Sequence, residues 1–218
     1  HPVFMDVDAR TWHLDVEKLA DFLTSRCERD DRGCVNRSTG RRIRAIVPVH
    51  LLGLACEIDR IVELANEYGI KVIEDAAESL GVRYRGKHTG TFGDIGAFSF
   101  NGNKIVTSGG GGMIVTHSLA YAERARYLTT QAKDNPTEYV HNQVGYNYRL
   151  TNVQAAIGVA QLEKLTDFVE RKRTIATAYE EGFKDLDGIE LMPRSANCEP
   201  TYWLYTVLLP ENTSIEKR

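Results

Sequence analysis

The sequence predicts an α/β fold built on a parallel sheet. Two short apolar runs, at residues 45–49 and 71–75, have the length and the β-branched content of buried strands. Between them, residues 58–68 carry apolar side chains at helical spacing, and Gly69 follows as a helix-ending residue. A strand, a helix and a second strand in this order form a βαβ unit, in which the two strands run parallel.

The other elements follow from the same patterns. Short apolar runs predict further strands at residues 2–7, 94–100, 112–116 and 203–209. Helical spacing predicts helices at 14–23, 120–130 and 152–165, the last running on with a kink through Tyr179. The polar, basic stretch 30–44 predicts a loop insertion. Because the pattern opens within a strand and stops shortly after another, we expect the chain to be an internal fragment of a larger protein.

Composition narrows the possible partners. The formal net charge of -3 gives no electrostatic reason to expect nucleic acid or an anionic membrane as a partner. No apolar run approaches the ~20 residues that a membrane-spanning helix needs. The cysteines form no CxxC pair and no zinc-ligand spacing with histidine, so we predict no metal site. Free thiols fit a reducing cytoplasm, which is the location that we expect.

Two residues suggest chemistry. Asp75 ends a predicted parallel strand, at the edge where open α/β sheets bind ligands. An acid there can be catalytic, can bind a ribose or a metal, or can cap the next segment. Lys104 follows an aromatic strand and an Asn-Gly-Asn turn, and precedes the glycine run 109–112, which allows close backbone approach. A solvated surface lysine is the simpler explanation of Lys104.

Together, Asp75 and Lys104 suggest Schiff-base chemistry. An amine that attacks a carbonyl needs an environment that favours its uncharged form. A pyridinium cofactor needs an acid beside its ring nitrogen. The two residues supply these two roles.

The sequence resembles the DegT/DnrJ/EryC1/StrS family of sugar aminotransferases. The resemblance runs nearly end to end and rests on specific motifs in order: Pro48-Val49-His50-Leu51-Leu52-Gly53, Glu74-Asp75-Ala76-Ala77-Glu78-Ser79, residues 93–100, Lys104 with its glycine run, and residues 145–150 followed by 154–158. It implies the fold type I, aspartate-aminotransferase-like architecture and pyridoxal 5'-phosphate as cofactor. Residues 1–165 would belong to the large cofactor-binding domain, and residues 166–218 to a linking helix and the start of a smaller domain.

The resemblance implies roles for individual residues. Lys104 would carry the cofactor as a Schiff base and then shuttle a proton. Asp75 would pair with the pyridine nitrogen. Ser99 would bind the phosphate through its hydroxyl group, and Glu78 stands where many members have a glutamine near the ring hydroxyl.

Two further residues complete the expected site. Asn147 resembles an asparagine that reaches the phosphate of the neighbouring subunit's cofactor, which implies a homodimer with shared sites. His50 stands at a strand end close to the ring. The alternatives are a turn residue for Asn147 and a hydrogen-bonded core histidine for His50. The missing N-terminal portion would carry a phosphate loop and a stacking aromatic, so we expect the fragment alone to retain cofactor weakly.

The sequence of residues 99–105, 130–133 and 141–150 resembles that of a narrower branch of this family. That branch aminates C4 of UDP-4-keto-6-deoxy-N-acetylglucosamine, and it serves bacillosamine and legionaminic acid pathways. The implied reaction has two halves. Glutamate first gives its amino group to the cofactor, which then aminates the nucleotide-linked keto sugar with Lys104 as general acid and base.

Rival functions find less support. Residues 81–88 nearly match a P-loop but lack its Ser or Thr, and no GxGxxG follows a first strand as a hydride-transfer enzyme would need. Related sugar dehydratases replace the lysine by histidine, whereas Lys104 is present. A non-catalytic dimerisation or sugar-nucleotide-binding module of the same fold is the alternative from a different class.

Overall fold

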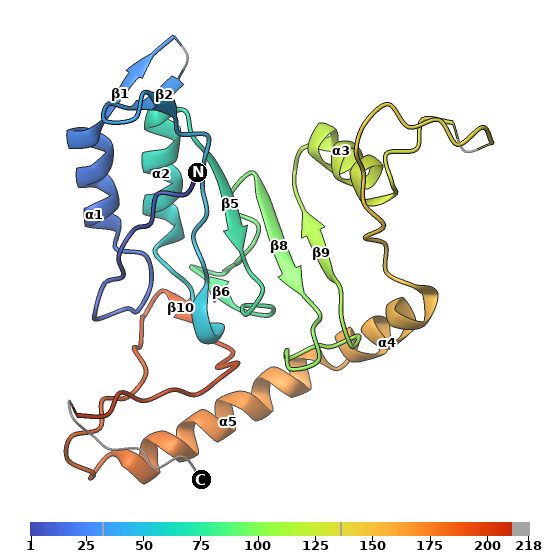
Figure 1. Cartoon of the computed structure of the whole chain (residues 1–218). Coiled ribbons are helices and arrows are strands. Elements are labelled where there is room, and N and C mark those ends of the chain that lie inside the picture. The colour runs from blue at the N-terminus through green and yellow to red at the C-terminus, as the bar shows by residue number, and fades with distance from the viewer. Residues whose placement is uncertain (32, 136, 211–218) are drawn as a thin grey trace.

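A mixed sheet lies at the centre of the computed structural model, which describes residues 1–31, 33–135 and 137–210 (Figure 1). Its strand order is β4-β5-β8-β9. Strands β4 (Ala45–Ile46), β5 (Lys71–Asp75) and β8 (Ile95–Ser99) run parallel. Strand β9 (Gly112–Val115) pairs with β8 in the antiparallel direction. The predicted parallel sheet is confirmed, with one antiparallel strand added at its edge.

Helices pack on this sheet to form the core. Helix α2 (Ile58–Tyr68) packs against β5, and α1 (Val16–Asp21), extended by a π-helical turn at Phe22–Arg26, packs against α2. Gly69 ends α2 with φ of 64°, as its sequence position predicts. The residues shared by these elements are buried and apolar, and include Leu19, Leu23, Ile58, Ile61 and Val72.

The basic segment at residues 30–44 is not a loop, and this prediction was wrong. Strands β1 (Cys27–Asp30), β2 (Gly33–Asn36) and β3 (Arg41–Arg42) form an antiparallel sheet. Most of the charged residues occupy exposed positions, while Cys27 and Cys34 are buried. The sequence of this segment therefore has the pattern of a solvated loop, although Cys27 and Cys34 pack into the core.

A second small antiparallel sheet ties the C-terminal segment to the body of the molecule. It has the order β10-β6-β7, with β6 at Arg83–Tyr84, β7 at Lys87–His88 and β10 at Cys198–Glu199. The predicted strands at 2–7 and 203–209 do not form ladders. Each has a single isolated bridge, Val7 to Leu14 and Leu208 to Glu190, because no longer partner runs beside it among the described residues.

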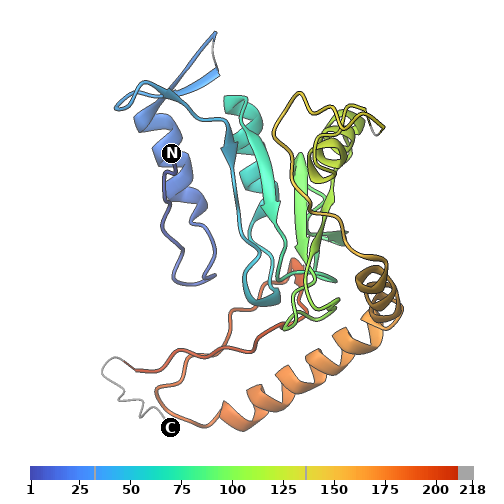
Figure 2. The ribbon, with the colours of Figure 1, turned by 45° about the vertical axis from the view of Figure 1, so that its right-hand side comes forward.

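The described part of the C-terminal half contains helices separated by long irregular segments. Helices α3 (Leu119–Thr129), α4 (Asn152–Leu162) and α5 (Leu165–Phe183) are present, and the break between α4 and α5 matches the predicted kink. Between α3 and α4, residues 131–135 and 137–150 project from the body (Figures 1 and 2). No helix within the described ranges is long and apolar enough to cross a membrane. Residues 211–218 of the second predicted domain lie outside the described residues.

Candidate active site

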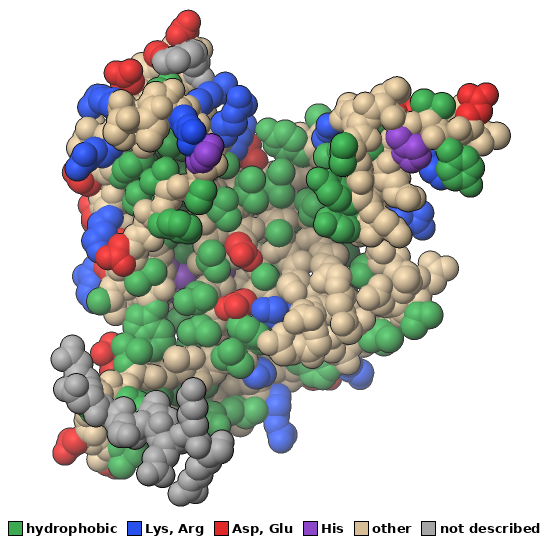
Figure 3. Space-filling model, viewed as in Figure 1, with side chains coloured by type: hydrophobic (Ala, Val, Ile, Leu, Met, Phe, Trp, Pro, Cys, Tyr) green, Lys and Arg blue, Asp and Glu red, His purple; other side chains and the backbone are tan. Residues whose placement is uncertain are grey.

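Asp75 is the last residue of β5, at the carboxyl end of the parallel strands. Its Oδ1 accepts a hydrogen bond from the N–H of Ala77 at 3.0 Å, while Oδ2 has no hydrogen-bond partner among the described residues. Figure 3 shows a hollow on this side of the molecule, lined by hydrophobic side chains, in which acidic and basic groups meet. Asp75 therefore offers a half-buried carboxylate oxygen at the edge of the sheet that binds ligands in this class of fold.

Strand β8 brings Ser99 to the same face as Asp75. Asp75 pairs with Ala97, and Ser99 follows two residues later, so all three side chains share one face. Oγ of Ser99 accepts a hydrogen bond from the N–H of Asn101 at 3.2 Å. Its partner on β9 is Gly112, where a Cβ would lie 2.3 Å from the Phe98 carbonyl oxygen. Glycine is therefore required for this close pairing.

Lys104 lies on the turn that follows β8, and its side chain is only 13% exposed. Its backbone N–H donates to the Asn101 carbonyl at 3.1 Å. Its Nζ lies 3.7 Å from Oε1 of Glu78 and 3.8 Å from the centre of the Trp203 ring. An amine recessed between a carboxylate and an indole face differs from the solvated surface lysine that was the alternative.

Glu78 is held by the 3-10 turn Leu51–Gly53. Its Oε2 accepts the N–H of Leu52 at 2.8 Å. Leu52 itself has φ of 59°, a left-handed conformation that is unfavourable for a branched residue and must be imposed by the surrounding contacts. The structure thus places Glu78 next to the amine of Lys104, and its predicted position near the ring hydroxyl of the cofactor stays a prediction.

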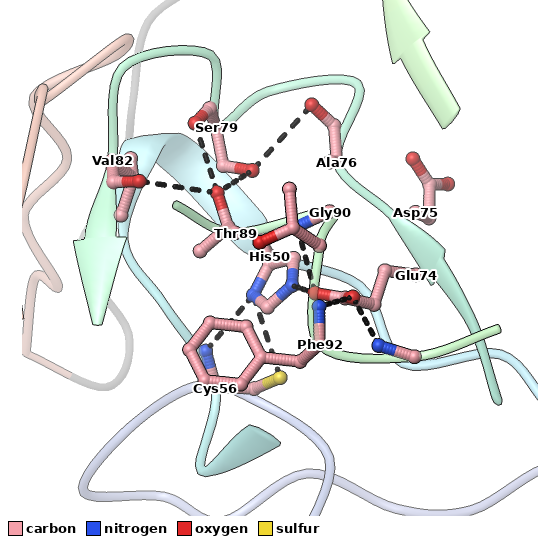
Figure 4. A network of polar contacts seen from close by, with 12 residues as sticks. His50, Cys56, Glu74, Asp75, Ala76, Ser79, Val82, Thr89, Gly90 and Phe92 are labelled. Carbon is pink, nitrogen blue, oxygen red and sulfur yellow. Dashed lines mark hydrogen bonds and ion pairs between the residues drawn. The ribbon is translucent and has the colours of Figure 1, made fainter. Parts of the chain in front are cut away.

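His50 lies in a buried network (Figure 4) and is completely inaccessible to solvent. Its Nδ1 accepts the N–H of Cys56 at 3.3 Å, so its proton sits on Nε2, which donates to Oε2 of Glu74 at 2.9 Å. Figure 4 shows the carboxyl group of Asp75 turned away from this network. The side chain of His50 therefore occupies the core, as its alternative predicts, and its link to Asp75 is its backbone N–H, which donates to the Asp75 carbonyl at 3.0 Å.

Glu74 is the centre of the same network. Besides His50, it accepts backbone N–H groups from Gly90 at 2.7 Å, Phe92 at 2.6 Å and Gly93 at 2.7 Å. Burial raises the pKa of Glu74, but the hydrogen bonds from His50 and these backbone groups outweigh it, and the pKa lies below its ordinary value. The carboxylate therefore fastens the loop that leads into β8, the strand that ends in Ser99.

Asn147 lies on the projecting segment and is exposed. It forms an antiparallel bridge with Thr130, and its neighbours Tyr146 and Tyr148 stack with ring centres 5.0 Å apart. The described contacts of this stretch run to the end of α3, not to Lys104 or Asp75. A contribution of Asn147 to a neighbouring subunit stays a prediction.

Sequence reasoning missed Trp203 as a site residue. It predicted Trp203 as the first residue of a strand, yet the indole lies against Lys104 and its N–H donates to the Asn103 carbonyl at 2.7 Å. The two segments are far apart in the chain, and no local pattern joins them.

Comparison with known proteins identifies the family. The DegT/DnrJ/EryC1/StrS aminotransferase family matches residues 1–218. A putative pyridoxal phosphate-dependent aminotransferase, EpsN of Bacillus subtilis, is 43% identical over 98% of this chain and 52% of the relative. A GDP-perosamine synthase of Escherichia coli O157:H7 is 40% identical over 95% of this chain and 52% of the relative.

Solved structures give the same result. The crystal structure of a DegT DnrJ EryC1 StrS aminotransferase from Brucella abortus superposes with a TM-score of 0.84 at 31% identity, over 97% of this chain and 53% of that one. The chain spans about half the length of the curated relatives it matches. It belongs to the DegT/DnrJ/EryC1/StrS family of pyridoxal-phosphate-dependent aminotransferases, and has their fold type I architecture.

Proposed function

We propose that the full-length protein transfers an amino group from glutamate to C4 of a nucleotide-linked 4-keto-6-deoxy sugar, with UDP-4-keto-6-deoxy-N-acetylglucosamine as its acceptor. The observation that supports this most is the recessed amine of Lys104, held beside Glu78 at the sheet edge that ends in Asp75. Relatives named GDP-perosamine synthase and UDP-N-acetyl-3-dehydro-alpha-D-glucosamine 3-aminotransferase support a nucleotide sugar as acceptor.

The residues present fit pyridoxal phosphate. When bound, this cofactor supplies a pyridinium ring that withdraws electrons from the carbon attached to the amino group. Oδ2 of Asp75, which has no partner in the described part of the chain, would hold a proton on the ring nitrogen, and the Nζ of Lys104 would attach the cofactor. Once released, the same Nζ would carry a proton from the donor carbon to the cofactor carbon in the first half-reaction, and from the cofactor carbon to the sugar carbon in the second. Glu78 holds that amine from one side.

The other residues would anchor the cofactor and complete the site. The hydroxyl of Ser99, at the end of β8, would bind the phosphate group. His50 steadies Asp75 through its backbone hydrogen bond. Asn147, which the chain exposes on its projecting segment, would serve the cofactor of a second copy, so that a homodimer forms two shared sites. Residues 1–165 would form the large domain, and residues 166–218 would start the small one.

Borohydride labelling tests the central role of Lys104. The full-length protein is mixed with pyridoxal phosphate, its visible spectrum is recorded, and the adduct is reduced and mapped by mass spectrometry. We expect the label on the peptide containing Lys104, and its loss in Lys104→Ala. Lys71→Ala is the control, because Lys71 is exposed and paired with Asp94. A label on another lysine, or no visible absorbance band, would contradict the proposal.

The acceptor is tested separately. UDP-, GDP- and dTDP-linked 4-keto-6-deoxy sugars are offered with glutamate, and the position of the new amino group is read by NMR. We expect the highest kcat/KM with the UDP-linked N-acetyl sugar and amination at C4. A preference for another nucleotide, or amination at C3, would overturn the acceptor and leave the aminotransferase chemistry standing.

A further inference from the structure

The indole of Trp203 makes two contacts on the segment that carries Lys104. Its ring centre lies 3.8 Å from Nζ, within the range of a cation–π contact. Its N–H donates to the carbonyl of Asn103, the residue before Lys104, at 2.7 Å. The residue is 6% exposed. One side chain therefore contacts both the amine and the backbone of the turn that presents it.

Trp203 is fixed in turn by two other parts of the fold. The N–H of Thr201 donates to the Gly53 carbonyl at 3.0 Å, and a Cβ on Gly53 would lie only 2.4 Å from the backbone nitrogen of Trp203. From α5, Nζ of Lys172 donates to the Trp203 carbonyl at 2.9 Å. The indole is thus placed by a turn and a helix outside the local segment 200–203.

The turn that holds Trp203 also holds Glu78, the other neighbour of the amine. The N–H of Leu52 donates to Oε2 of Glu78 at 2.8 Å. The carboxylate and the indole therefore contact Nζ of Lys104 at 3.7 Å and 3.8 Å from supports that share the turn Leu51–Gly53. A lysine side chain has many rotamers, and confinement by two rigidly supported groups restricts the amine to few of them.

We propose that Trp203 is a positioning residue for the catalytic amine of Lys104. Its ring face restricts the positions that Nζ can occupy, and the hydrogen bond from its N–H to the Asn103 carbonyl fixes the turn that carries Lys104. This inference rests on the proposed role of Lys104. Trp203 acts on the lysine rather than on the sugar, so its loss lowers the rate of chemistry more than the binding of either substrate.

The test compares Trp203→Phe and Trp203→Leu with the wild-type full-length protein. The first measurement is the rate at which Lys104 of the cofactor-free protein takes up added pyridoxal phosphate, quenched by borohydride and read by mass spectrometry. Because Trp203→Leu loses the ring that confines Nζ and the hydrogen bond that fixes the turn, we expect its rate to fall by about tenfold. Trp203→Phe keeps a ring face but lacks the N–H, so its rate lies between the two. The second measurement is kcat, which should fall in parallel while both KM values stay within about twofold of wild type.

Trp12→Phe is the matched control for the loss of a tryptophan, and labelling of the exposed Lys71 is the internal control. Circular dichroism shows whether each variant is folded, and Trp203→Phe, which retains most of the buried volume, carries the test if Trp203→Leu is not. Equal labelling rates of Lys104 in wild type and Trp203→Phe, or a rise of KM with unchanged kcat, would overturn the inference. Failure of the wild-type protein to label Lys104 would instead refute the proposed function.

Discussion

Replacing Glu74 by glutamine tests the buried network behind the candidate site. The carboxylate accepts four hydrogen bonds, and its two oxygens divide them equally. Oε2 accepts from His50 and the Gly90 N–H, and Oε1 accepts from the N–H groups of Phe92 and Gly93. A glutamine amide has only one oxygen, so its NH2 group must face two of these donors in either orientation.

The size of the effect follows from that geometry. Two buried or part-buried donors lose their acceptor, and each such loss costs about 1–3 kcal/mol. Glu74→Gln should therefore lower the free energy of unfolding by roughly 4 kcal/mol, and lower Tm with it. The pKa of Glu74 lies below its ordinary value, so the carboxylate's contribution is present above pH ~4.5 and is lost as the pH falls through the lowered pKa.

Thermal unfolding of the full-length protein at pH 7, followed by circular dichroism, measures the difference. Glu67→Gln is the matched control, because Glu67 is exposed on α2 and its replacement should change stability by less than about 0.5 kcal/mol. The gap between wild type and Glu74→Gln should also narrow in acid. A variant within about 1 kcal/mol of wild type at pH 7 would show that the four bonds do not hold the loop as described.

Other predictions follow from separate contacts. Burial lowers the pKa of His13 from 6.5 to about 4, so on acidification the unfolded chain binds a proton at a higher pH than the folded one. The free energy of unfolding should therefore fall by about 3 kcal/mol between pH 6.5 and 4. In a pH series of unfolding curves, His13→Gln should lose less stability over this range than the wild type. Gly53→Ala should lower the free energy of unfolding in urea by at least about 2 kcal/mol, because φ of Gly53 is 83° and the new Cβ would meet the backbone of Trp203. Gly69→Ala is the comparison: its φ is also positive, but its Cβ would meet no described atom, so it should cost about 1 kcal/mol. If sites are shared, an equal mixture of refolded Lys104→Ala and Asn147→Ala chains should recover about a quarter of wild-type activity, and no recovery would exclude sharing.

The parts of the fold that the sequence predicts are those whose signals are local. Helix α2 and strand β5 have clear periodicity and a glycine at the right end, and both form within a residue of the expected bounds. The sheet β1-β2-β3 was missed because its charged side chains hide the alternation, and the expected strand at 203–209 failed because strand pairing depends on a partner elsewhere in the chain.

The same division applies to the site. Lys104 and Asp75 are visible from motifs, since each stands in a distinctive local context. Trp203 is not, because its contact with Lys104 joins two segments separated by nearly half of the chain and depends on the turn at Gly53. His50 shows the converse. It belongs to a motif and was predicted beside the cofactor, yet its side chain lies in the core. Successive side chains at the end of a strand point to opposite faces of the sheet, so a motif there contains both core residues and residues of the open face.

The adjacent acids at the end of β5 illustrate why burial decides their roles. Side chains alternate along a strand, so Glu74 and Asp75 cannot face the same side. Glu74 points into the core, where only a carboxylate with a full set of donors is stable, and it has four. Asp75 points to the open face and keeps an oxygen without a partner among the described residues. Exchanging the two acids, as Glu74→Asp with Asp75→Glu, keeps the net charge. The shorter acid in the core would no longer reach its hydrogen-bond donors, and the longer acid on the open face would place its carboxylate beyond the position that Asp75 gives it.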